Sequence, residues 1–176
     1  MSSITTNKLD KYGWPARWLH WLMALFFVSQ IGLGFWMAYQ GAYGWYSWHK
    51  VLGVVLLMLA IVRFAWRMAN VVPHLRWLTT WQRRTAQLTH YLLYVMMLAM
   101  PISGMLMSSY ADKPVVLWGI AWRLPLTPDQ SLAEWFRSIH QLAAYGLVVL
   151  LFIHTAAAIK HHFWDGDHVL LRMLGR

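Results

Sequence analysis

The 176-residue sequence contains no cysteine. This absence excludes disulfide bonds, iron–sulfur clusters and covalently attached c-type haem, all of which need thiols. Charge is also scarce, because only 12% of the residues are Asp, Glu, Lys or Arg, about half of the fraction usual for a soluble domain. Lipid suits the surface of such a chain better than water does. The composition therefore predicts a protein embedded in a lipid bilayer.

Acidic residues are especially few, and all six lie outside the long apolar segments. The resulting net charge of +9 could indicate a nucleic-acid partner. The basic residues, however, gather near the ends of the apolar segments, as they do when they set the orientation of a membrane protein. We therefore expect no nucleic-acid partner.

Four apolar runs cover roughly residues 18–39, 48–68, 88–108 and 139–160. Each is close to the about 20 residues that a helix needs to cross a hydrocarbon core. Several of the thirteen Trp lie beside these runs, as in the aromatic belts of membrane proteins. The pattern predicts an all-α integral membrane four-helix bundle that forms a single domain over residues 1–176.

The distribution of Lys and Arg predicts the orientation of this bundle. Eleven lie in the two tails or around the connection between the second and third runs: Lys8, Lys11, Arg17, Arg63, Arg67, Arg76, Arg83, Arg84, Lys160, Arg172 and Arg176. The opposite side has four, Lys50, Lys113, Arg123 and Arg137. Because the side richer in Lys and Arg remains in the cytoplasm, both termini should be cytoplasmic. We expect a multi-pass protein of the bacterial inner membrane.

Five of the nine histidines lie within the apolar runs or at their edges: His20, His49, His90, His140 and His154. An ionisable side chain at membrane depth is costly and usually has a function. A single histidine could merely hydrogen-bond to a neighbouring helix. Five such residues favour a cofactor.

The spacing of His140 and His154 is the most informative feature. Fourteen residues make nearly four helical turns, so both imidazoles leave one face, about 21 Å apart along the axis. His49 matches His140 in depth, and His20 matches His154. Haem iron that only transfers electrons takes two axial ligands. The pattern predicts two b-type haems stacked across the bilayer, with these four histidines as iron ligands.

Small and basic residues recur around these histidines. Ala143, Ala144, Ala157 and Ala158 follow the ligands of the fourth run by three or four residues, and Gly53 follows His49 by four, which leaves room for a porphyrin. Close helix packing could also explain these small residues, but their repetition around both histidines favours haem. Arg17 and Arg137 each precede a ligand by three residues and could bind haem propionates, or could only extend to the membrane surface.

His90 and His161 have no unique assignment. His90 begins the third run on the cytoplasmic side and could replace His20 as the partner of His154, because spacing does not decide between them. His161 lies seven residues after His154 and nearer the cytoplasm. Both could hydrogen-bond a quinone carbonyl, or both could be ordinary interfacial histidines.

Several motifs resemble the bacterial cytochrome b561 family, in particular its superoxide oxidases. They are R-W-L-H-W at 17–21, W-H-K-x-x-G at 48–53, T-H-Y-L-L-Y at 89–94, H-T-A-A-A-x-K-H-H-F-W at 154–164 and L-L-R-M at 170–173. The resemblance implies that His20 and His154 hold a cytoplasmic haem and His49 and His140 a periplasmic one. It also implies that His90 is not an axial ligand, and that electrons pass from periplasmic superoxide to ubiquinone.

Two functions are consistent with these features. The first is a superoxide:ubiquinone oxidoreductase, in which Lys50, Lys113, Arg123 and Arg137 steer the superoxide anion towards the periplasmic haem. His90 or His161 would then relay protons to the quinone. The alternative is a membrane-anchor subunit that relays electrons between the quinone pool and a partner dehydrogenase or hydrogenase. In that case the same charges would form a docking surface for the partner redox protein.

Overall fold

The computed structural model describes residues 12–70, 78–117, 119–167 and 169–175. This part of the chain contains four long apolar helices: α1 (Trp14–Gln40), α2 (Tyr46–Ala69), α3 (Thr80–Tyr110) and α4 (Gln130–Phe163). Each is long and apolar enough to cross a membrane. The predicted all-α membrane fold is therefore confirmed.

Two helices begin well before the apolar runs that revealed them. α3 begins at Thr80 rather than near residue 88, and α4 at Gln130 rather than near residue 139. Thr79 and Gln82 form a reciprocal capping box, and the Asp129 side chain accepts a hydrogen bond from the Leu132 N–H. Such caps stabilise polar first turns, which a search for apolar runs cannot detect.

Short elements connect or follow the long helices. A 3₁₀ turn, η1 (Tyr43–Trp45), joins α1 to α2, and a small helix, α5 (Val169–Leu174), follows α4. Between α3 and α4, the strands β1 (Val115–Leu117) and β2 (Ile120–Trp122) form an antiparallel hairpin. Neither this hairpin nor α5 was predicted from the sequence.

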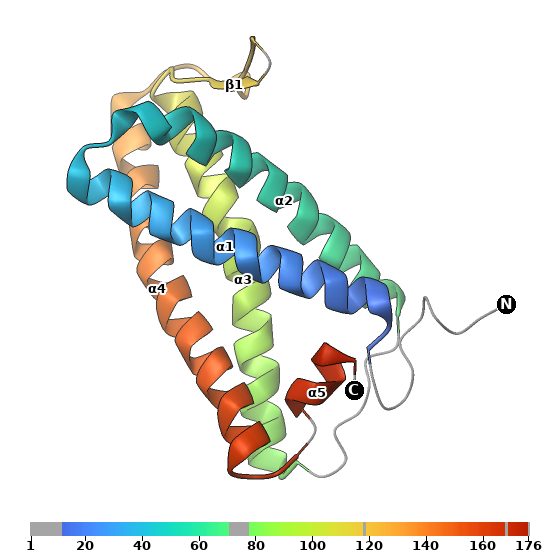
Figure 1. Cartoon of the computed structure of the whole chain (residues 1–176). Helices are drawn as coiled ribbons and strands as arrows, with labels where there is room; N and C mark the ends of the chain where they lie inside the picture. Colours follow the sequence, from blue (N-terminus) through green and yellow to red (C-terminus); the bar gives the residue numbers. More distant parts are fainter. Residues whose placement is uncertain (1–11, 71–77, 118, 168, 176) are drawn as a thin grey trace, which may run out of the picture.

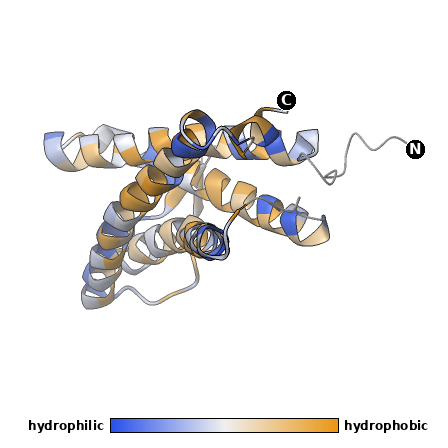
Figure 2. Cartoon of the chain, turned by 90° about the horizontal axis from the view of Figure 1, so that it is seen from below, coloured by the Kyte–Doolittle hydropathy of each residue, from blue (hydrophilic) through white to orange (hydrophobic). Residues whose placement is uncertain are grey.

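The bundle has two chemically different ends. α3 runs beside α4, and α1 beside α2, while the hairpin and α5 lie at opposite ends (Figure 1). We call these the hairpin end and the terminal end. Figure 2 shows mostly apolar helices with polar residues concentrated near their ends. Arg63 and Arg67 belong to α2 and not to the connection after it, whereas Lys8, Lys11, Arg76 and Arg176 lie outside the described residues.

An apolar core separates the two ends. Its buried residues come from all four long helices: Met23, Phe27, Leu56, Ala60, Leu93 and Leu147. Leu147 is almost completely buried and lies seven residues from both His140 and His154. Seven residues make nearly two turns, so this side chain leaves the same face midway between the two histidines. The core therefore lies between two histidine levels.

Candidate functional site

At the hairpin end, α2 and α4 bring His49 and His140 together. Their ring centres lie 6.2 Å apart and their planes are nearly perpendicular, at 80°. A metal ion held between two imidazole nitrogens separates the ring centres by about 6 Å, because each metal–nitrogen bond is about 2 Å long. The spacing of this pair therefore fits bis-histidine ligation.

The second ring nitrogen of His140 has two acceptors on α3. Nδ1 lies 2.9 Å from the Met100 carbonyl oxygen and 3.1 Å from Oγ of buried Ser103, which itself donates to Met100 O. A proton on Nδ1 satisfies both acceptors and leaves Nε2 free to bind a metal. Ligating histidines are usually held in this way.

His49 is held mainly through its backbone. Gln30 on α1 donates a side-chain hydrogen bond to the His49 carbonyl, whereas His49 Nδ1 and Gln30 Oε1 are buried without a hydrogen-bond partner among the described residues. Two glycines lie against the rings of this pair. A Cβ at Gly34 would lie 3.2 Å from His49 Cε1, and one at Gly104 would lie 3.2 Å from His140 Cε1. Larger residues would displace these imidazoles.

At the terminal end, three histidines from three helices meet. His20 and His154 have ring centres 6.2 Å apart, the separation also found at the hairpin end, with planes at 70°. His90 approaches His154 more closely, at 5.5 Å. The structure thus brings both candidate partners beside His154, and the His20 pair has the spacing that an intervening metal needs.

The positively charged guanidinium of Arg63 lies beside the His20 ring. Its guanidinium donates to the Ala16 carbonyl at 3.1 Å, and Nη2 lies 3.3 Å from His20 Nδ1. Arg67, one turn on, lies over the Tyr94 ring at 5.5 Å. Among the described residues, no carboxylate forms an ion pair with either arginine. The positive charge of Arg63 beside His20 therefore has no carboxylate counter-charge among the described residues.

The two arginines proposed for propionates lie in different surroundings. Arg17 is half-buried, and its guanidinium occupies the space beside Gly175, so it contacts the segment after α5. Nearby, Trp21 Nε1 donates to the Met173 carbonyl at 3.2 Å, which ties α1 to α5. Arg137 is exposed at the hairpin end. Both positions remain compatible with propionate binding.

The predicted small residues differ in burial. Ala143 is buried, Ala144 and Ala158 are half-buried, and Ala157 is exposed. Gly53 faces Gln30, whose Nε2 would lie 3.7 Å from an added Cβ. Gly34 and Gly104, which the sequence analysis did not select, are the glycines nearest to the imidazoles of His49 and His140. Gly34 lies on α1 and Gly104 on α3, whereas His49 lies on α2 and His140 on α4. These contacts could therefore be found only once the packing of the helices was known.

The four cations proposed for steering are not equivalent. Lys50 donates to the carbonyl oxygens of Lys113 and Pro114, at 2.9 and 3.5 Å, so the first two cations lie close together. Arg123 forms an exposed ion pair with Asp112, which offsets its charge. Lys50, Lys113 and Arg137 form no ion pair among the described residues, while the carboxylates of Asp129 and Glu134 lie at the same end of α4 as Arg137.

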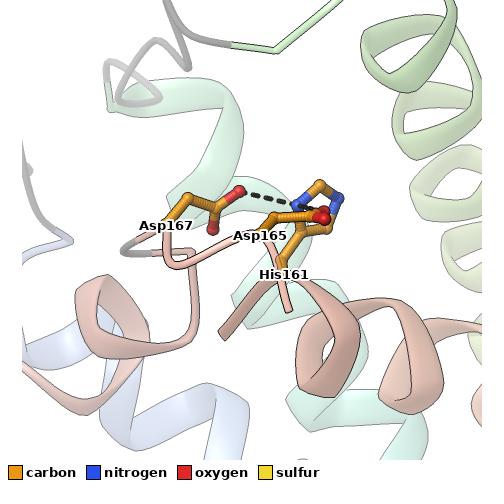
Figure 3. A group of neighbouring side chains, drawn as sticks. All are labelled: His161, Asp165 and Asp167. Carbon is orange, nitrogen blue, oxygen red and sulfur yellow. Dashed lines mark hydrogen bonds and ion pairs between the residues drawn. The ribbon is translucent and has the colours of Figure 1, made fainter. Parts of the chain in front are cut away.

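His161 lies in a small polar cluster beyond the histidine triad (Figure 3). Its Nδ1 is 2.6 Å from Asp167 Oδ2 and 3.1 Å from Asp165 Oδ2. The hydrogen bond from Lys160 holds the pKa of the Asp165 carboxyl below its usual value. Both carboxylates can accept a hydrogen bond from an Nδ1–H of His161. His90, by contrast, has His154 as its neighbour.

The donor set of each histidine pair fits the axial ligation of a haem iron. Imidazoles are paired at two levels, and small residues line the rings of the first pair. The chain has no thiol for an iron–sulfur cluster.

The profile of the family described as prokaryotic cytochrome b561 matches residues 11–176. The chain belongs to this family. Cytochrome b561 homolog 2 of Escherichia coli K12 is 34% identical to it, over 97% of this chain and 95% of its own length. Cytochrome b561 homolog 1 of the same organism is 28% identical, over 70% of this chain and 68% of its own. The probable superoxide oxidase CybB of Yersinia pestis is 26% identical over 51% of each chain.

Membership of the cytochrome b561 family establishes the general role. The protein is a membrane electron-transfer protein that binds b-type haem, and its four apolar helices make it a multi-pass protein of the bacterial inner membrane.

Proposed function

We propose that this cytochrome b561 binds two b haems, oxidises superoxide at the hairpin end and reduces ubiquinone at the terminal end. The observation that carries the proposal is the pair of equal ring separations, 6.2 Å for His49–His140 and 6.2 Å for His20–His154, at opposite ends of the bundle. The haems would supply one-electron redox chemistry at two levels. The apolar core around Leu147 would keep water away from the space between them.

The hairpin end would face the periplasm. Lys50 and Lys113 lie together there, and Arg137 is exposed, so a small anion would experience a positive field as it approaches His49 and His140. Superoxide gives up one electron and leaves as dioxygen. Two superoxide anions, one ubiquinone and two protons yield two dioxygen molecules and one ubiquinol.

The terminal end would face the cytoplasm and supply those two protons. His161 with Asp167 is placed to hold a proton near the surface, and His90 lies deeper, beside His154. In this proposal either residue could donate to a quinone oxygen. His20 rather than His90 pairs with His154, because the His20 ring has the separation found at the other haem site.

The decisive experiment uses purified, haem-loaded protein with ubiquinone and no partner protein. Superoxide should reduce the haems in stopped-flow mixing, and quinol should form well above the uncatalysed rate. Quinol formation no faster than in buffer, together with rapid haem reduction by a co-purifying dehydrogenase or hydrogenase, would instead make the protein a relay subunit.

A further inference from the structure

The groups behind the two histidine pairs have opposite electrostatic character. His140 Nδ1 faces oxygen acceptors, the Met100 carbonyl at 2.9 Å and Ser103 Oγ at 3.1 Å. His20 Nδ1 faces a guanidinium nitrogen of Arg63 at 3.3 Å. A guanidinium carries only hydrogen-bond donors and keeps its charge, so it cannot accept a hydrogen bond from His20 Nδ1.

We propose that these contacts tune the two haem sites in opposite directions. Met100 and Ser103 lower the reduction potential at the hairpin end, and Arg63 raises it at the terminal end. This inference rests on the proposed assignment of haem to the two histidine pairs.

The lower reduction potential at the hairpin end follows from the basicity of the His140 ligand. When an imidazole donates its second N–H to a good acceptor, its other nitrogen becomes a stronger donor to the metal. A stronger donor favours the ferric state, which lowers the reduction potential. Ser103 is 4% exposed and also donates to Met100, so both acceptors are fixed in one turn of α3.

The higher reduction potential at the terminal end follows from the charge of Arg63. Arg63 is anchored by its hydrogen bond to the Ala16 carbonyl, which keeps its guanidinium beside His20. No carboxylate pairs with Arg63 within the described ranges, so its charge is not cancelled locally. A fixed positive charge at low dielectric favours the state with one more electron. Arg63 therefore raises the potential of the neighbouring site.

The two effects together give electron transfer a direction. Electrons move towards the site of higher potential, so the terminal end accepts them from the hairpin end. Electron transfer from superoxide to quinone requires this direction. Two sites with identical surroundings would have equal potentials and would not favour it.

Potentiometric titration of the purified protein, followed at the haem α band, tests both effects. Ser103→Ala should raise the hairpin-end midpoint, and Arg63→Gln should lower the terminal-end midpoint. We expect each midpoint potential to shift by up to about 59 mV, which corresponds to a tenfold change in the one-electron equilibrium constant. Parallel titration of His140→Ala, which should keep only the terminal-end haem, assigns the two midpoints.

Matched variants separate tuning from loss of structure. Ser108→Ala removes another buried hydroxyl from α3, and Arg67→Gln removes a charge one turn from Arg63. Both should shift the midpoints less than the test variants do. Arg63→Lys keeps the charge and should retain most of the terminal-end potential.

Unchanged midpoints in Ser103→Ala and Arg63→Gln, or shifts of opposite sign, would refute the tuning while leaving the haem assignment intact. Wild-type protein with fewer than two haems per chain, measured as pyridine haemochrome, would instead overturn the proposed function. If Arg63→Gln does not fold, a lowered terminal-end potential in Arg63→Lys would refute the charge argument.

Discussion

His20 and His154 place their ring centres 6.2 Å apart, the same separation as that between His49 and His140 at the other end of the bundle. Equal ring separations at both ends are what we expect if each pair holds a metal in the same way. His90 lies nearer to His154, at 5.5 Å, which leaves less room for a metal between the rings. The His20 ring therefore fits a shared metal with His154 better than the His90 ring does.

We expect wild-type protein to contain two haems and His140→Ala or His154→Ala to contain one, because each variant removes one axial ligand. His90→Ala should retain both low-spin spectra. Pyridine haemochrome assays and low-temperature spectra measure these outcomes. A low-spin signal that disappears in His90→Ala but persists in His20→Ala would reverse the assignment at the terminal end.

Gly34→Ala and Gly104→Ala should disturb the hairpin-end haem. Each added Cβ would lie 3.2 Å from an imidazole carbon, and a ring bound to iron cannot move away freely. Each change also favours a helix by about 1 kcal/mol, so weaker folding should not mask the effect. We expect a shifted α band or lower haem content.

Gly32→Ala and Gly146→Ala are the matched controls for this pair. An added Cβ at either position meets nothing within 4 Å. These controls should keep the wild-type spectrum. Equal spectra in all four variants would show that the imidazoles do not lie against Gly34 and Gly104 in the loaded protein.

Reduction by superoxide should slow as ionic strength rises, because salt screens the attraction of an anion to a positive surface. Lys50→Gln, Lys113→Gln and Arg137→Gln should slow it at low salt, and Arg123→Gln should slow it less because Asp112 already offsets that charge. Stopped-flow rates over a salt series measure both effects. Equal losses from all four variants would contradict the role given to Asp112.

The absence of cysteine allows a simple test of orientation. A single cysteine replaces Ser131 at the hairpin end or Thr80 at the terminal end, both of them exposed. In intact cells with a permeable outer membrane, an impermeant maleimide should label Ser131→Cys and not Thr80→Cys. After lysis both should be labelled. The reverse pattern in intact cells would place the termini in the periplasm.

Much of the architecture was accessible from the sequence. Apolar runs reveal membrane helices because the hydrocarbon core demands about 20 apolar residues. The fourteen-residue interval between His140 and His154 predicts two levels because helical rise and twist are constant. The capped polar turns after Thr79 and Asp129 were missed, since their stability comes from hydrogen bonds and not from hydropathy.

The sequence alone determined that four helices carry histidines at two depths, since local periodicity and hydropathy are properties of a continuous segment. Only the tertiary structure decided which groups contact Nδ1 of each imidazole. They are the Met100 carbonyl and Ser103 at His140, and Arg63 at His20. These contacts join different helices, so their distances depend on how the helices pack. The rotation of each helix relative to its neighbour determines these distances, and they cannot be predicted from residue spacing within a single helix.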